Sequence, residues 1–553
     1  MGTGIALALP TLIAHYPPMS DLPLHEGVVG ILRHLGDASY FPRDLYTLNL
    51  GQANQLFYLV AWVLSYAVGT TWAMKLVISA AQLMIFWSGA RLADHLGRSR
   101  WGVPLLAPLA LGFTYYWGLV ANLVGFAAFL GALPTLDRAA ARPSPRSAMA
   151  ACGLLVLLFF AHEAMFFAAL GVVGVLAIAY PVERRKTAIR AVPVAFAMVF
   201  MGAHWLYQQR SFTRGQITPP MSFDPFVEKV VSIPKTLFGA HDIAALLMLF
   251  GVSLIAIGAL VVRRVRSTER AEDPTTAEAN AQAAAAAKES ARTKRALLWI
   301  RAALLRYRFE TTGLGFLALY FVMPYEWRGA TLIYQRFLGP AWALLVICAS
   351  PREAPWVAKV ASGVVPAALL LFSWSQFVDS DRTYRDLDVV IAQIPKGSSV
   401  GLCALERPLV VDARLFSAGV GPARAVADRG GRVSLSLTVG PLSPVQIRPE
   451  WRWNDFDIRT RTVGSRAMKP AHDLDRYGWV IVHSRDVPMR RVLIEAFEPD
   501  AEYLMTLGEF MLFRSRHPQA PLTSPDVPAP SDMDTVVDRV NKLWRTPRGR
   551  EAP

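Results

Sequence analysis

Residues 102–136 contain no Asp, Glu, Lys or Arg, a run too long and too apolar for the interior of an ordinary soluble domain. About 20 apolar residues in a helix cross the hydrocarbon core of a bilayer. We therefore predict two helices here, joined by a tight turn near Trp117–Asn122. Residues 147–182 carry one charge, at Glu163, and predict a second hairpin that turns at His162–Glu163. Both segments indicate that the chain is embedded in a membrane.

Further segments are apolar enough to cross or enter a bilayer, and the composition agrees. Only 18% of the 553 residues are charged and 53% are hydrophobic, whereas a typical soluble protein has about 25% charged residues. Together with the hairpins, these segments give about eleven transmembrane helices. The predicted fold is mainly α: a polytopic membrane helical bundle with a small C-terminal α/β domain outside the membrane. The additional segments are residues 2–14, 72–91, 189–206, 242–263, 310–324, 334–349 and 356–377.

Basic residues collect in the loops between the apolar segments, and these loops fix the predicted sidedness. Lys and Arg accumulate on the cytoplasmic side of membrane proteins. The loops at residues 91–100, 138–146, 184–190 and 263–308 are therefore expected in the cytoplasm. The formal net charge of +15 is explained in this way without a nucleic-acid partner, which would need a basic stripe on a folded soluble surface.

Residues 55–69 are apolar but would reverse this sidedness if they crossed the membrane. Their aromatic side chains, such as Tyr58 and Trp62, suit the headgroup boundary, so we predict a helix that lies in the outer interface. The N-terminus is then cytoplasmic, whereas the first outer loop, residues 15–70, and the C-terminal domain lie outside. These features predict a multi-pass protein of the bacterial inner membrane.

Composition also suggests the domain boundaries. Residues 1–380 are predicted to form the membrane domain, with a further outer loop at 207–241 and a low-complexity, Ala-rich cytoplasmic linker within 264–308. Short apolar runs bounded by turn residues predict a small α/β domain over 385–515. Its expected strands lie within residues 398–405, 432–440, 479–484 and 502–513, with a helix at 490–497. The Pro-rich tail, 516–553, is expected to be disordered apart from a short helix around 533–544.

The candidate catalytic residue is Asp21, in the outer-loop sequence YPPMSDLPLHEG. It follows the first apolar segment closely, so it is expected at the outer membrane boundary, and Pro23 suits the first turn of a helix. An Asp at this point is also typical of an N-cap that accepts backbone N–H bonds. His25 lies four residues on and can share the face of Asp21, although an interfacial His is more often a solvated helix residue. The sequence leaves the catalytic and the structural interpretations open.

A short first span, followed by a loop with an acidic residue soon after a Pro-Pro pair, resembles the GT-C superfold of membrane glycosyltransferases. That group includes oligosaccharyltransferases, protein mannosyltransferases and lipid A aminoarabinose transferases. Residues 49–69 resemble the interfacial helix of their first outer loop, and residues 101–131 resemble their hairpin with a second functional outer turn. Residues 325–345, YEWRGATLIYQRFLGPAWALL, resemble the later segment that carries an Arg. The resemblance covers most of the chain in layout but only scattered residues in identity.

The resemblance implies a set of site residues. Asp21 corresponds to the catalytic or metal-binding carboxylate of the first outer loop, and His25 is expected to contact substrate beside it. Asn122 stands in the second outer turn, where metal-binding members often have a second acidic residue. This departure favours a reaction without a metal, and no metal ligand or other cofactor is assigned. Arg336 or Arg328 is expected to neutralise the donor phosphate, because the Arg fork matches phosphate oxygens; for Arg336, snorkelling at the interface is the alternative.

The predicted function is transfer of a sugar from a polyprenyl-phosphate-linked donor to a lipid, glycan or protein acceptor on the outer face, with membrane lipids as surroundings. The alternatives are a transporter or flippase of lipid-linked glycan, and a scaffold with the same fold but no activity. The spans are nearly free of charge and show no internal repeat, which favours the enzyme over the transporter. His162 and Glu163, in an outer turn, are expected to be solvated.

Overall fold

The computed structural model describes residues 1–41, 44–180, 184–211, 221–239, 243–270, 292–326, 331–404, 418–434, 436–440, 442–448, 477–485 and 487–516. The chain forms two compact units. The first contains residues 1–9, 78–115 and 119–373, and the second contains residues 10–77, 116–118 and 374 onward. The division falls within helices α1 (Gly2–Ile13), α4 (Thr70–His95), α6 (Phe113–Trp117) and α18 (Trp356–Ala392). The outer loop predicted at 15–70 therefore belongs to the second unit.

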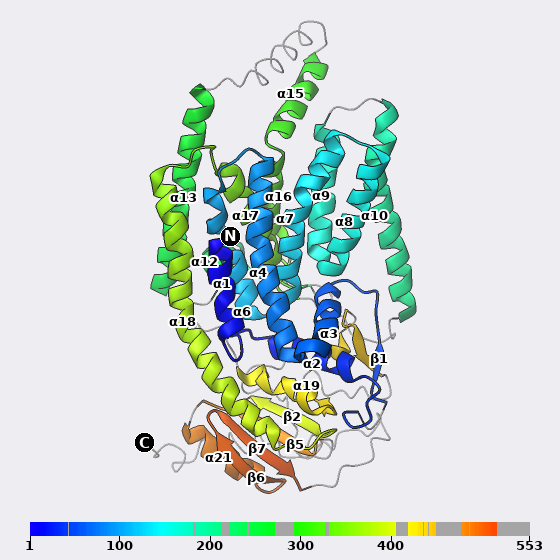
Figure 1. Cartoon of the computed structure of the whole chain (residues 1–553), viewed down its shortest axis with the longest axis vertical. Helices are drawn as coiled ribbons and strands as arrows, with labels where there is room; N and C mark the ends of the chain where they lie inside the picture. The colour runs from blue at the N-terminus through cyan, green and yellow to red at the C-terminus, as the bar shows by residue number, and fades with distance from the viewer. Residues whose placement is uncertain are drawn as a thin grey trace. The chain divides into compact units, whose positions relative to one another are not determined.

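The described part of the first unit is made almost entirely of helices (Figure 1). Besides parts of α1, α4, α6 and α18, it contains η1 (Arg100–Leu106), α5 (Ala107–Leu111), α7 (Val120–Ala141), α8 (Pro145–Ala161), α9 (Glu163–Ala179), α10 (Arg184–Ser211), α11 (Phe226–Val231), α12 (Ile233–Phe238), α13 (Ile243–Arg270), α15 (Arg292–Arg306), α16 (Arg308–Val322) and α17 (Gln335–Ala349).

Several of these helices can cross a membrane. Within the described residues, α4, α7, α10, α13 and α18 are long and apolar enough to do so, and α1, α8, α9 and α17 are shorter apolar helices. Helix α10 leaves much of its apolar surface uncovered by protein, with Met198 and Val199 64% and 72% exposed. A continuous apolar surface of this kind suits contact with lipid tails rather than water. The prediction of a mainly α protein with several helices long and apolar enough to cross a membrane is confirmed.

The hairpin predicted over residues 147–182 is present. Helix α8 ends at Ala161 and α9 begins at Glu163, and the two helices pack against each other. His162, between them, is extended, with φ −166° and ψ 122°. Ser144 starts α8 by accepting a bond from the N–H of Ser147, whose hydroxyl in turn accepts from the N–H of Ser144. The chain reverses where the sequence predicts.

The helix predicted from residue 102 to the turn near 117 is wrong as a continuous span. The chain forms three short pieces there, η1, α5 and α6. Pro104 and Pro108 have no N–H to donate, and their rings clash with the preceding turn of a regular α-helix. Gly112 separates α5 from α6, and a Cβ there would lie 1.9 Å from the carbonyl oxygen of Leu237 in α12. The chain therefore bends where the backbone of α12 approaches it.

The second unit holds residues 15–70 and a C-terminal sheet (Figure 1). Its described elements include α2 (Leu22–His34), α3 (Leu56–Val68), η2 (Ala418–Arg424), α19 (Ala425–Arg429), η3 (Leu437–Val439) and α21 (Val487–Phe497). A five-stranded sheet has the order β3–β2–β5–β7–β6, and a two-stranded sheet pairs β1 with β4. The strands are β1 (Tyr46–Leu48), β2 (Ser399–Ala404), β3 (Arg432–Val433), β4 (Val445–Ile447), β5 (Trp479–His483), β6 (Ala501–Leu507) and β7 (Phe510–Ser515).

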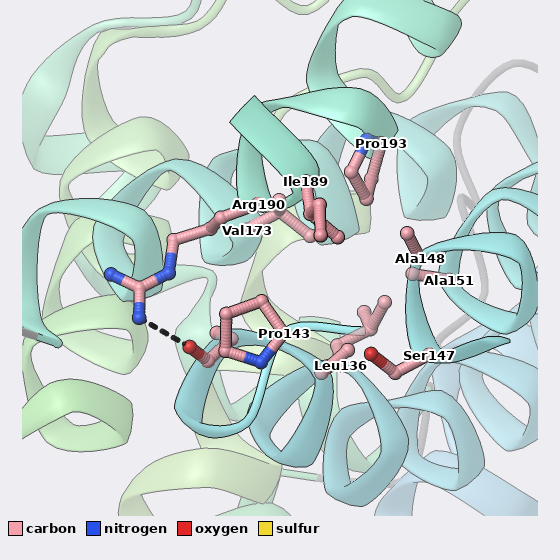
Figure 2. Close-up of a pocket in the computed structure, with 11 residues that line it drawn as sticks. Leu136, Pro143, Ser147, Ala148, Ala151, Val173, Ile189, Arg190 and Pro193 are labelled. Carbon is pink, nitrogen blue, oxygen red and sulfur yellow. Dashed lines mark hydrogen bonds between the residues drawn. The ribbon is translucent and has the colours of Figure 1, made fainter. Parts of the chain in front are cut away.

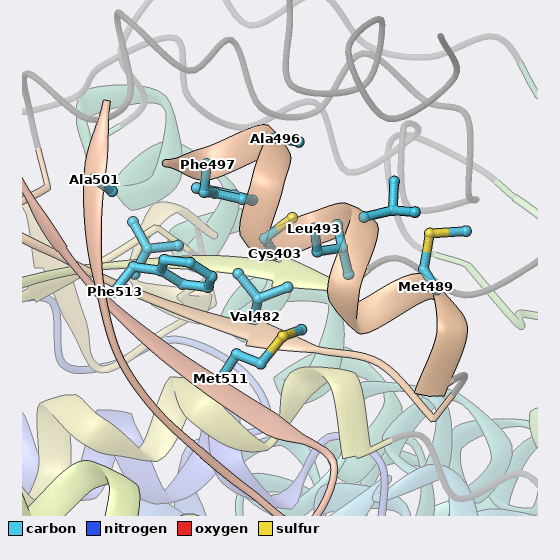
Figure 3. Packing of buried hydrophobic residues seen from close by; sticks show 11 residues of the cluster. Cys403, Val482, Met489, Leu493, Ala496, Phe497, Ala501, Met511 and Phe513 are labelled. Atoms are coloured by element: carbon cyan, nitrogen blue, oxygen red, sulfur yellow. The ribbon is translucent and has the colours of Figure 1, made fainter. Parts of the chain in front are cut away.

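The larger sheet is mixed. Strand β2 is parallel to β3 and β5, whereas β7 is antiparallel to both β5 and β6. Helix α21 covers one face, where Leu493 and Phe497 pack on Val482, Met511 and Phe513 (Figure 3). The rings of Phe497 and Phe513 stack with centroids 4.8 Å apart. The strands predicted within 398–405 and 479–484, and the helix predicted at 490–497, are confirmed. The single strand predicted over 502–513 is wrong, because a turn at Gly508–Glu509 divides it into the antiparallel strands β6 and β7.

Two predictions at the start of this region are wrong. The strand expected over 432–440 is limited to β3, because Ser436 accepts a bond from the N–H of Thr438 and starts the 3-10 turn η3. The span predicted to end at 377 continues as α18 to Ala392. Its last turns are amphipathic: Tyr384, Leu387 and Ile391 recur at helical spacing and are at most 1% exposed. The tail beyond Arg516, with its expected short helix, lies outside the described residues.

Candidate functional site

Asp21 stands at the N-terminus of α2, with Pro23 in the first turn. Its side chain makes no capping hydrogen bond. The backbone explains this, because φ −91° and ψ −1° place Asp21 in the helical region, whereas an N-cap that bonds its own helix is normally extended. The capping role that the sequence left open is therefore absent, and the helix starts without help from this carboxylate.

The backbone at Asp21 is held by the turn at 116–118. The N–H of Ser20 donates to the carbonyl of Tyr116 at 2.9 Å, and the N–H of Asp21 donates to the carbonyl of Trp117 at 3.1 Å. Gly118 has φ +86°, and a Cβ there would lie only 2.6 Å from the nitrogen of Asp21. Only glycine combines this conformation with so close an approach. The segment around Asp21 and the turn near Trp117–Asn122, both singled out by the sequence, are thus in direct contact.

His25, one turn further along α2, also stabilises the contact with the 116–118 turn. Its Nε2 lies 3.1 Å from the carbonyl oxygen of Gly118, and its Nδ1 lies 2.6 Å from the hydroxyl of Tyr58. A carbonyl only accepts, so Nε2 carries the proton and Nδ1 accepts from Tyr58. Burial lowers the pKa of His25 to about 4, with the bond to Gly118 opposing the shift. The ring is therefore neutral near pH 7, and both of its nitrogens have partners within the protein.

Tyr58 extends this arrangement to α3. Its side chain is 5% exposed, and burial first and the charge of Asp21 second raise its pKa. The hydroxyl therefore stays protonated as a donor to His25. The Asp21 carboxylate is therefore near enough to Tyr58 for its charge to act on that hydroxyl. Asp21, His25, Tyr58 and Gly118 form one group, which we call the Asp21 group.

Glu26, the next residue of α2, has very different surroundings. It is 1% exposed and accepts bonds from the hydroxyls of Tyr16, at 2.8 Å, and Thr71. Arg424 Nε lies 3.7 Å from this carboxylate. The same guanidinium donates to Asp388 at 2.6 Å and lies 3.5 Å from Asp428. We call Tyr16, Glu26, Asp388, Arg424 and Asp428 the Arg424 cluster.

One cation is thus shared by three carboxylates in this cluster. Burial lowers the pKa of Arg424, but the carboxylates of Glu26, Asp428 and Asp388 outweigh that effect and raise it above its usual value. Burial, and then the charge of Glu26, raise the pKa of Tyr16 well above its usual value, so its hydroxyl remains a donor. Burial raises the pKa of Asp428 to about 6, so this carboxylate titrates closest to neutral pH. Arg424 keeps its charge and Tyr16 keeps its proton near pH 7, which is the behaviour of a structural network.

Two glycines let α2 approach the segment that carries Arg424. A Cβ on Gly30 would lie 2.4 Å from the Cα of Ala427 in α19, and a Cβ on Gly27 would lie 2.9 Å from Val426 Cγ1. The first distance is a clash with backbone, which cannot move aside as a flexible side chain can. The GxxG spacing therefore seats α2 directly on α19 and brings Glu26 within reach of Arg424.

A second group of site residues lies in the first unit. Arg336, in the first turn of α17, has its Nη1 3.3 Å from Nε2 of His162, and its Nη2 donates to the carbonyl of Thr331 at 3.2 Å. His162 is 1% exposed, so the expectation that it is solvated is wrong: it packs at the α8–α9 break against α7, where a Cβ on Gly125 would lie 2.5 Å from its Cβ. Arg336 uses its guanidinium within the protein, which differs from simple snorkelling.

Among the residues that the structure describes, Arg336, His162 and Asn122 each have a buried donor without an acceptor. Arginine has no acceptor atom, so Nε2 of His162 accepts from Arg336 and Nδ1 carries the proton. Within the described residues, this Nδ1, Nε of Arg336 and Nδ2 of Asn122 are buried without a hydrogen-bond partner. Asn122 is 2% exposed and lies one turn before Gly125 on α7. Each such donor costs about 1–3 kcal/mol if it stays unsatisfied, so this polar group suits an anion or another acceptor.

Other candidate sites are weaker. Arg328 lies outside the described residues. A cavity between α7, α8, α9 and α10 is lined mainly by apolar side chains such as Leu136, Val173 and Pro193 (Figure 2). Its volume of about 20 Å³ is too small for a sugar, and Arg190 at its edge already donates to the carbonyl of Ala140 at 2.6 Å. In the described part of the chain, no three His, Cys, Asp or Glu side chains are grouped so as to hold a metal ion.

The sequence singles out Asp21, His25, Asn122 and Arg336 as candidate site residues. It does not indicate Tyr58 as the partner of His25, or His162 as the partner of Arg336. Long-range pairings of this kind leave no mark in a single sequence. Comparison with known protein families gives no match, and no curated protein matches the chain.

Proposed function

We propose that the chain is a GT-C-type glycosyltransferase that moves a sugar from a polyprenyl-phosphate-linked donor to a lipid, glycan or protein acceptor on the outer face of the bacterial inner membrane. The observation that carries this proposal is the state of Asp21. Its backbone is fixed by the 116–118 turn, yet its carboxylate makes no capping bond. A positioned carboxylate that is not needed for the helix is suited to proton transfer.

The proposed reaction needs a base and a cation. Asp21 takes the proton of the acceptor hydroxyl as its oxygen attacks the anomeric carbon, and the bond from that carbon to the phosphate oxygen breaks. The phosphate leaves with the electron pair, so its negative charge grows in the transition state. Donors aimed at such a charge lower the barrier. We expect Arg336 to supply a permanent cation, His162 to supply a buried N–H donor beside it, and Asn122 on α7 to supply a further buried N–H donor.

A flippase of lipid-linked glycan is the second candidate, because the same three buried donors suit a transported phosphate. The two functions differ in one observable: a transferase releases polyprenyl phosphate, whereas a flippase moves its substrate intact. Purified protein in liposomes with a radiolabelled polyprenyl-phosphate sugar and mixed acceptors therefore separates them. Release of polyprenyl phosphate supports the transferase, and translocation without cleavage overturns it.

Arg336 is tested in the same assay. Arg336→Lys keeps the charge but loses bidentate binding, so we expect a donor KM that is raised about tenfold or more, within the range for one hydrogen bond to a charged group. Arg138→Lys, on an exposed side chain of α7, is the matched control and should leave the KM unchanged. An unchanged KM in a well-folded Arg336→Lys protein removes Arg336 from the site and leaves Arg328 as the next candidate.

The proposed orientation is tested separately. A reporter fused near Ser99 should read cytoplasmic, and one near Ala404 should read external. Both residues belong to segments whose sidedness follows from the basic loops and from an interfacial, rather than spanning, α3. An external reading at Ser99 would overturn this orientation.

A further inference from the structure

An open cavity of about 760 Å³ lies in the first unit, far larger than the apolar cavity of Figure 2. It is bounded by the end of the apolar part of α13, the start of η1 and the start of α18. Its volume is in the range of sites that accept small molecules. Four basic side chains and one acidic side chain line it: Arg263, Arg266, Arg352, Lys359 and Glu353.

The charge around the cavity is unbalanced. Arg263 pairs with Glu353 at 3.4 Å, and the exposed cations of Arg266, Arg352 and Lys359 have no ion pair with a residue that the structure describes. The nearby carboxylate of Glu310 is already used, because Arg264 Nη2 lies 2.6 Å from it and Arg98 Nη2 lies 4.0 Å from it. The cavity therefore presents a surplus of positive charge to any ligand that enters it.

Tryptophans mark the depth of this cavity in the membrane. Trp101 and Trp356 line it and are 47% and 74% exposed. Trp side chains concentrate where hydrocarbon gives way to headgroups. The apolar part of α13 ends at Arg266, and α18 begins at Trp356. The cavity thus combines the ends of two helices that can cross a membrane with two tryptophans and four cations. This combination is typical of the depth of lipid headgroups.

We propose that this cavity binds an anionic phospholipid by its phosphodiester headgroup, with Arg266, Arg352 and Lys359 as the phosphate-binding residues. The aromatic faces of Trp101 and Trp356 contact the glycerol and upper acyl region. Basic pockets between transmembrane helices recognise anionic headgroups in this way. The proposal is independent of the transferase reaction and of Asp21.

Native mass spectrometry of the purified full chain, loaded with equal amounts of phosphatidylglycerol and phosphatidylcholine, tests the proposal. The test variant carries Arg266→Gln, Arg352→Gln and Lys359→Gln. The matched control carries Arg138→Gln, Arg142→Gln and Arg146→Gln, which removes three charges from a loop that does not line the cavity. Each cation near a membrane surface contributes about fivefold in affinity, so we expect a loss of roughly a hundredfold in the test variant. The control should retain phosphatidylglycerol as the natural chain does.

A second variant, which is expected to increase lipid binding, keeps the test valid if the triple variant fails to fold. Glu353→Gln removes the one carboxylate of the cavity and should strengthen phosphatidylglycerol retention about fivefold. Equal loss from both triple variants, or no gain in Glu353→Gln, would overturn the proposal. Displacement of the lipid by millimolar inorganic phosphate would overturn the lipid as ligand and assign the site to a soluble phosphate anion.

Discussion

Helix α2 carries two carboxylates, Asp21 and Glu26, whose surroundings differ completely. Glu26 is 1% exposed and bonded to two hydroxyls, and it shares the cation of Arg424 with Asp388 and Asp428. Asp21 is only partly buried, and its side chain makes no capping bond while its backbone is held by the 116–118 turn. Pairing and burial commit Glu26 to holding the fold, whereas Asp21 keeps a carboxylate suited to a substrate.

Within the Asp21 group, His25 and Asp21 also differ in what their side chains are available to do. His25 has partners on both ring nitrogens and is neutral near pH 7. It therefore acts as a positioning residue that ties α2 to α3 and to Gly118, and both of its ring nitrogens are already bonded within the protein. The predicted role of His25 in substrate contact thus becomes a role in holding Asp21.

The largest effect is expected at Arg424. Arg424→Met removes the cation from three carboxylates and leaves Glu26 buried and uncompensated. We expect the free energy of unfolding to fall by about 3–5 kcal/mol, measured by chemical denaturation in detergent or, if the protein no longer folds, by loss of the monodisperse peak. Arg429→Met is the matched control, because Arg429 donates to the backbone carbonyls of Ile391 and Ala392 and, among the described residues, has no ion pair. A loss no larger at Arg424 than at Arg429 would show that the cluster is not structural.

The next effect is expected at Gly118. Gly118→Ala forces a Cβ to within 2.6 Å of the nitrogen of Asp21 and strains a residue with φ +86°. We expect a loss of about 1–3 kcal/mol in stability together with a fall in transfer rate. Gly36→Ala is the control, since Gly36 has φ +91° but a Cβ there meets no atom within 4 Å. Equal losses of rate in the two variants would mean that the 116–118 turn does not position Asp21.

The smallest effect is a pH dependence from His25. Its folded pKa of about 4 lies below the ordinary value of 6.5, so between these values the unfolded chain binds more protons than the folded one. The stability that neutral His25 contributes is complete above pH 6.5 and is lost as the pH falls toward 4. The difference in thermal midpoint between the natural chain and His25→Gln should therefore shrink from pH 7.5 to pH 4.5. A constant difference would contradict the buried, neutral state of His25.

Much of the layout could be predicted from the sequence because apolar length and basic loops are local signals. The α8–α9 break at His162, the helix at Leu56–Val68 and most strands of the C-terminal sheet follow from such patterns. The broken segment before Trp117 does not follow from hydropathy, because Pro104 and Pro108 interrupt the helix without changing the apolar character of the segment. The continuation of α18 to Ala392 was also readable from its helical apolar spacing.

The environments of the site residues could not be predicted in the same way. Nothing near Glu26 in the sequence indicates Arg424, which is nearly 400 residues away in the chain, and nothing near Arg336 indicates His162. Whether Asp21 caps α2 depends on one pair of backbone angles, φ −91° and ψ −1°. Such pairings follow from the tertiary fold, and a single sequence carries no trace of them.

The most direct test of the proposed chemistry is the rate of polyprenyl phosphate release by Asp21→Asn, measured on protein whose stability is determined in the same preparation. Asn has the same shape but cannot take the proton, so we expect a rate lower by about 10² to 10⁴. The free energy of unfolding should change by less than about 0.5 kcal/mol, because no capping bond is lost. Full release of polyprenyl phosphate by the Asp21→Asn protein would contradict Asp21 as the general base.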